Sequence, residues 1–75
     1  MASKLIGSIV STDTSTNLKT VFHVHKDGGS VTFTKPDSEG WSHLCHPSVK
    51  NTPEGWAREA NTLYGGFADS EFFPI

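Results

Sequence analysis

The fold is decided by residues 18–35, which read LKTVFHVHKDGGSVTFTK. Apolar and polar side chains alternate on both sides of the glycines, which is the pattern of two half-buried strands. His23 and His25 share the outer face of the first strand. The apolar face of this strand is predicted to carry Leu18, Thr20, Phe22 and Val24.

The turn between these strands fixes their register. Asp27-Gly28 accepts the positive φ angles of a type I′ turn, so it predicts a two-residue hairpin loop. With the turn at this position, Phe22 pairs with Phe33 and apolar residues meet apolar residues. A turn at Gly28-Gly29 would set Phe22 against Lys35, so we expect the first register.

A helix is predicted over residues 53–64. Thr52 and Pro53 have the residue types of an N-cap and a first helical position, and Gly65-Gly66 supplies the stop. The apolar side carries Trp56, Ala60 and Leu63, flanked by Ala57 and Tyr64, and the opposite side carries Arg58, Glu59 and Asn61. One face of this helix is therefore expected to pack on the sheet.

The fold class that follows is α+β: a small antiparallel β-meander packed against one α-helix. Three strands are expected, over residues 4–11, 18–26 and 29–35. Residues 36–51 are expected to form an ordered loop with at most one helical turn, because Pro36, Gly40 and Pro47 interrupt any regular period. The C-terminal tail, residues 67–75, is too apolar to stay free and is a candidate fourth strand at an edge of the sheet.

Composition limits the classes of protein to which the chain can belong. Its 75 residues make one domain, 1–75, and Met1-Ala2 is interpreted as the native start of a complete small protein. The first residues are too short an apolar stretch for a signal peptide or a membrane span. One cysteine excludes an intrachain disulfide and indicates the reducing cytoplasm. We expect a cytoplasmic protein with no membrane partner.

Charge argues against nucleic acid as a direct partner. The net charge is −2, the lysines are scattered, and the acids are concentrated in the second half of the chain. A protein that grips phosphates needs a dense basic stripe, which is missing here. The acidic half could face a basic groove on another protein, but on charge alone a plain solvated surface is the favoured interpretation.

All four histidines and the cysteine fall into two clusters, which raises the question of a metal. Imidazole and thiolate are the preferred ligands of zinc, and small domains often need a metal. The alternative is exposed histidines on a strand and a small buried cysteine, and the spacing matches no common zinc motif. The candidate metal ligands are His23, His25, His43, Cys45 and His46.

Catalysis by Cys45 is the third hypothesis. A neighbouring His43 or His46 would have to activate the thiol in a cleft with an oxyanion donor. A 75-residue domain with one helix has little room for such a cleft. We expect no enzyme and no catalytic residue.

The favoured function is a non-enzymatic protein-binding module. A small acidic chain without a catalytic motif is expected to act as a regulator or inhibitor that occupies a surface of a larger protein or nucleoprotein complex. Phage accessory proteins that block host or defence machinery are an analogy of size and composition. A homodimer through an exposed sheet edge is also open. The residues expected to meet the partner are Trp41, Asp37, Glu39 and His43.

Overall fold

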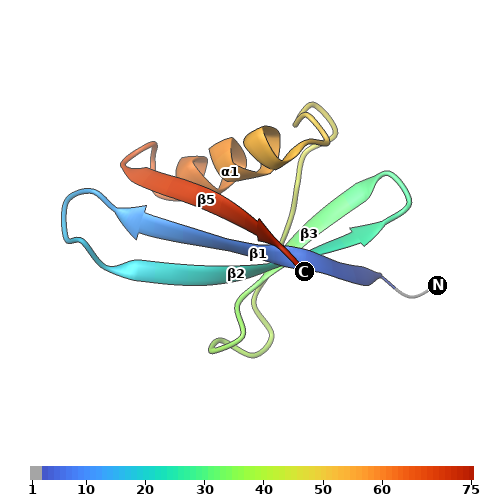
Figure 1. Ribbon diagram of the computed structural model, residues 1–75, viewed down its shortest axis with the longest axis horizontal. Coiled ribbons are helices and arrows are strands. Elements are labelled where there is room, and N and C mark those ends of the chain that lie inside the picture. The colour runs from blue at the N-terminus through green and yellow to red at the C-terminus, as the bar shows by residue number, and fades with distance from the viewer. Residues whose placement is uncertain (1–2) are drawn as a thin grey trace.

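The computed structural model describes residues 3–75, which form five strands and one helix (Figure 1). All strand pairs are antiparallel and follow the order β4-β3-β2-β1-β5, so the predicted α+β class is confirmed. The candidate strand in the tail is β5, at one edge of the sheet. The elements are β1 (Lys4–Asp13), β2 (Lys19–Asp27), β3 (Ser30–Thr34), β4 (Ser42–Leu44), α1 (Pro53–Thr62) and β5 (Ala68–Pro74).

The hairpin of β2 and β3 turns at Gly28-Gly29, so the predicted turn at Asp27-Gly28 is wrong. In the observed register Val24 pairs with Phe33. Gly28 has a φ of +60°, as the first central residue of a type II′ turn requires. The pairing moves by two positions, and because side chains alternate with a period of two, the predicted buried face is unchanged.

The contacts of Lys35 stabilise the observed register, which the sequence disfavours because it places this lysine opposite Phe22. Its Nζ lies 5.7 Å from the centre of the Phe22 ring and 4.5 Å from the Trp41 ring. The ammonium group therefore contacts the two aromatic faces by cation–π attraction while Lys35 remains half-exposed. In the sequence alone Lys35 is a charge placed opposite the apolar Phe22, and only the structure shows the two rings that receive it.

Strand β4 corrects the prediction of a loop over residues 36–51. Its three residues pair with β3, with Thr32 opposite Leu44, and the backbone N–H of Cys45 continues the pairing by donating to the Val31 carbonyl. The strand has no apolar alternation, since Leu44 is 64% exposed. Its position is set by pairing with β3, which a local pattern does not reveal.

Helix α1 begins as predicted and ends two residues earlier, at Thr62. The Thr52 side chain accepts a hydrogen bond from the Gly55 N–H, and Pro53 opens the helix. Trp56 and Ala60 are buried, as expected for the apolar side. No helix in residues 3–75 has the length and apolar character to cross a membrane.

Two polar residues of the helix were assigned to the wrong side. Glu59 accepts a hydrogen bond from the His43 ring, and Asn61 accepts one from the Ser70 hydroxyl. Ser70 is in turn bonded to the fully buried Ser11, with 2.6 Å between the two hydroxyl oxygens. This chain of bonds ties α1 to β5 and β1 and satisfies the buried hydroxyl.

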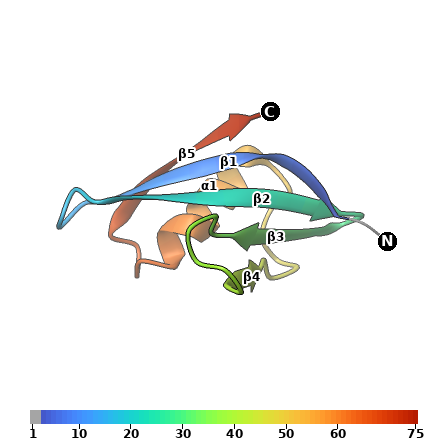
Figure 2. The same ribbon diagram turned by 90° about the horizontal axis from the view of Figure 1, so that it is seen from below.

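The core lies between α1 and the inner face of the sheet. Leu18, predicted for this face, is 69% exposed because β2 begins only at Lys19. Seen from below, the strands β1 and β2 lie in front of the helix, and no second layer from residues 3–75 covers the face that they present (Figure 2). The buried cluster consists of Ile9, Phe22, Val24, Val31, Phe33, Cys45, Trp56 and Ala60.

Gly7 is the place where β5 approaches β1 most tightly. A methyl group at this residue would lie 2.5 Å from the Phe73 carbonyl oxygen and 2.6 Å from the ring of Phe72. The missing side chain is therefore what allows the Phe72 ring to lie over β1 and reach Trp56, at 5.2 Å between ring centres.

Gly7→Ala is expected to lower the free energy of unfolding by about 1–3 kcal/mol, because the added methyl overpacks the β1–β5 contact. Urea denaturation followed by tryptophan fluorescence measures this change. Gly29→Ala is the matched control, since its new methyl meets nothing within 4 Å. Equal stability of both variants would contradict the role given to Gly7.

Candidate functional site

The first histidine cluster lies on the outer face of the sheet, as predicted. The His23 and His25 rings are 6.5 Å apart between centres and meet edge to face. The Nε2 of His25 is hydrogen-bonded to the Thr34 hydroxyl at 2.9 Å. Both histidines are half-buried within the polar part of this face.

The side chains of the second cluster, which consists of His43, Cys45 and His46, point in three different directions. His43 points inward, with its Nε2 at 2.7 Å from the Glu59 carboxylate and its ring 5.9 Å from that of Phe33. Cys45 is buried in the core, whereas the exposed His46 is bonded to Ser48. Within residues 3–75, no three His, Cys, Asp or Glu side chains are grouped so that they could hold a metal ion. Metal binding by the five candidate residues stays a hypothesis that needs a rearranged loop.

The environment of Cys45 disfavours a thiolate. Burial, and secondly the negative charge of Glu59, raises the pKa of the Cys45 thiol to about 11. A nucleophilic cysteine needs the opposite, an exposed thiol with a lowered pKa. His43, the proposed activator, is engaged with Glu59 instead.

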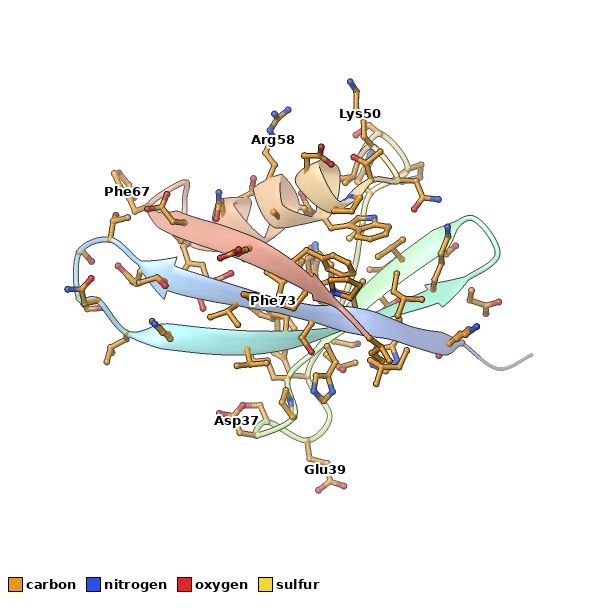
Figure 3. All side chains as sticks on the ribbon, viewed as in Figure 1. Asp37, Glu39, Lys50, Arg58, Phe67 and Phe73 are labelled. Carbon is orange, nitrogen blue, oxygen red and sulfur yellow. The ribbon has the colours of Figure 1, made fainter. Side chains whose placement is uncertain are left out.

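The four residues expected to meet a partner lie in two settings. Trp41 is half-buried, 5.6 Å from Phe22 between ring centres, and His43 is held by Glu59, so both support the fold. Asp37 and Glu39 are exposed on the loop between β3 and β4. Figure 3 shows these two acids at one extreme of the molecule and Lys50 and Arg58 at the opposite extreme.

The outer face of the sheet combines exposed apolar side chains with polar ones. Leu5, Val21 and Phe73 are 39%, 40% and 48% exposed, and the pairing of β2, β1 and β5 places them on the face opposite α1. Val10 lies between β2 and β5 and pairs with Val21. The face also carries histidine, serine and threonine side chains together with the charged Lys19, Asp69 and Glu71.

A shallow groove of about 490 Å³ crosses this face. Its lining combines the apolar Val10 and Phe73 with the acidic Asp69 and Glu71 of β5. The lining residues are Val10, Thr12, Lys19, Asp69, Ser70, Glu71 and Phe73.

A second groove of about 550 Å³ follows the solvent side of α1. Lys50 and Arg58 line it together with Glu54 and Glu59. Because the two signs of charge are mixed, this groove presents no field that would select one kind of ligand.

Sequence reasoning did not single out the residues of the outer face. The usable signal was the tail, where Asp69, Glu71 and Phe73 follow each other at intervals of two and so share one face of a strand. The tail was recognised as too apolar to stay free, but its polar face was not assigned a role.

No protein-family model matches the chain, and no curated protein or solved structure matches it either.

Cys45 is expected to react about 100-fold more slowly with iodoacetamide at pH 8 in the folded protein than in denaturant, because its raised pKa reduces the thiolate and burial blocks access. Mass spectrometry of timed samples measures the rate. Fast, selective alkylation of the folded chain would support the enzyme hypothesis instead.

Purified without chelator, the protein is expected to show the mass of the bare chain in a native mass spectrum, since its candidate ligands lie apart. A second spectrum after EDTA treatment is the control. A zinc-sized increment that disappears with EDTA, together with unfolding, would establish the metal hypothesis and make the five His and Cys residues the site.

Proposed function

We propose that the protein is a non-enzymatic binding module that occupies a surface of a larger protein. The observation that carries this proposal is the outer face of the sheet, which has exposed apolar side chains and a groove and which no element of residues 3–75 covers. An antiparallel sheet can face water on one side, but that side is then expected to be polar. Leu5, Val21 and Phe73 depart from that pattern on the same face.

The composition of the face supports an interface more than a second core. Aliphatic and aromatic residues lie among serine, threonine and histidine side chains, which can remain hydrated before the partner binds. A face of this kind can be exposed to water in the free protein, and burying its apolar side chains under a partner still contributes favourable free energy to binding.

The acidic loop offers a second contact for the same kind of partner. Asp37 and Glu39 are exposed, as are Asp69 and Glu71 on β5, so two separate surfaces are anionic. A basic surface on the partner, such as one that normally holds nucleic acid, would suit both. We propose on this ground a regulator or inhibitor, acting in the cytoplasm where the free Cys45 stays reduced.

Immobilised protein is expected to retain a partner from a lysate of its source cell, and Val21→Lys and Phe73→Lys are each expected to lose that partner. A lysine placed on the outer face removes apolar contact area and adds an unpaired charge to the buried interface. The retained protein is identified and quantified by mass spectrometry.

Leu18→Lys is the matched control, because Leu18 is 69% exposed and precedes β2, so this variant should retain the partner. Near-ultraviolet circular dichroism confirms that each variant is folded. Retention of the partner by both outer-face variants would contradict the proposed face. If charge-reversal variants of Asp37 and Glu39 then lost the partner, the contact would be assigned to the acidic loop.

A further inference from the structure

Strand β5 has one side without a partner strand. It is the last strand of the sheet, and within residues 3–75 it pairs only with β1. In Figures 1 and 2 its C-terminal half runs clear of helix α1. The free edge therefore presents backbone groups to solvent, and such groups are a template for an additional strand.

The hydrogen bonds at both ends of the β1–β5 pair show which residues face that edge. Ile75 donates its N–H to the Ile6 carbonyl, and Thr14 donates to the Phe67 carbonyl. Because antiparallel pairs alternate between bonded and non-bonded positions, the odd-numbered residues of β5 point their backbone groups toward β1. The even-numbered residues, which are Ala68, Ser70, Phe72 and Pro74, point theirs outward.

Pro74 fits this alternation. Proline has no backbone N–H, and because the backbone of residue 74 faces away from β1, no hydrogen bond to β1 is lost. Ser70 and Phe72 each present both an N–H and a C=O at the edge. A strand added beside them can thus form two bonded pairs before it reaches the proline.

The side chains beside this edge carry a defined charge. Asp69 and Glu71 are exposed on the outer face, and neither forms an ion pair within residues 3–75. Lys19 is the one cation of the groove, and it is separated from Asp69 by Thr12 of the intervening strand β1. Phe73 lies on the same face, two residues beyond Glu71.

A second copy of the chain does not suit this edge. Antiparallel pairing of β5 with itself around Ser70 sets Asp69 against Glu71, and pairing around Glu71 sets that acid against its own copy. Pairing around Phe72 avoids these contacts but sets Ser70 opposite Pro74, which has no N–H to donate. The edge therefore disfavours the homodimer and favours a strand of opposite charge.

We propose, as an extension of the binding function above, that the free edge of β5 takes up an extended basic segment of the partner as a sixth strand. Its backbone pairs with Ser70 and Phe72, and its alternate side chains lie on the outer face. Two basic side chains then meet Glu71 and Asp69, and an apolar one lies beside Phe73. Backbone bonds supply affinity in this mode, and the alternate side chains supply specificity.

The probe is a fluorescein-labelled peptide of sequence Thr-Leu-Thr-Arg-Thr-Arg-Thr, which in the antiparallel direction sets leucine beside Phe73 and the arginines beside Glu71 and Asp69. Fluorescence anisotropy is expected to show saturable binding that weakens as salt is raised. In the complex, amide hydrogen exchange at Ser70 and Phe72 is expected to slow, since their N–H groups become bonded.

Two matched pairs test the geometry. Glu71→Lys is expected to weaken binding about tenfold or more, whereas Glu54→Lys, an exposed acid on α1, leaves it unchanged. N-methylation of the two threonines that precede the arginines removes the N–H groups facing β5 and is expected to abolish binding. N-methylation of the arginines, whose N–H groups point away, is expected to leave binding in place.

Absence of binding, or binding that is indifferent to Glu71→Lys and to threonine methylation, overturns the strand addition. If the immobilised protein still retains its partner through Val21 and Phe73 in that case, the binding module stands and only the β5 edge is wrong. Concentration-dependent dimerisation in sedimentation velocity, with protected Ser70 and Phe72 amides, would overturn the inference in favour of self-pairing.

Discussion

The structure depends on how one ten-residue helix covers a five-stranded sheet. Trp56 is the central contact, because its ring packs on Phe72, and Phe72 in turn lies over Gly7. The bonds from Asn61 through Ser70 to Ser11 fix the helix along the same strands. These contacts place α1 over β5 and β1, and they leave the inner face of β2 and β3 to be covered by other parts of the chain.

The loop after β3 provides that cover. Trp41 lies against Phe22, and β4 brings His43 over Phe33 and toward Glu59. The segment that looked irregular in sequence is therefore a structural part of the core. Trp41 and His43, which were expected to meet a partner, therefore contact other parts of the fold. Asp37 and Glu39 of the same loop are exposed to solvent.

The sequence predicted the elements well where the signal was local. Alternation in β2 and β3, the cap at Thr52 and the apolar tail all led to elements that the structure contains. The predicted hairpin register was wrong because the alternation of apolar residues does not show that the Lys35 ammonium group can lie over the rings of Phe22 and Trp41. Strand β4 was missed because its three residues show no alternation of apolar and polar side chains, and its position is set by pairing with β3.

Local sequence says less about a candidate site than about the fold. Histidine and cysteine attracted attention because their chemistry is distinctive, but residue type does not show that Cys45 points into the core and His46 away from it. The outer face was inaccessible to local reasoning because it is assembled across β2, β1 and β5. Only the pairing of β1 with both neighbours shows that Val21, Val10 and Phe73 form one surface.

The free edge of β5 unites two properties that are usually considered separately. Charged residues and proline at a sheet edge protect a protein from pairing with its own copies. Here the same residues, Asp69, Glu71 and Pro74, leave the backbone groups of Ser70 and Phe72 available for pairing. Whether a strand can pair with this edge then depends on the charge of that strand. In the proposed mode of binding an acidic strand is repelled and a basic strand is accepted, and specificity arises from that difference in free energy. A thin domain with one covered face can in this way remain separate from its copies and still keep a surface for a partner.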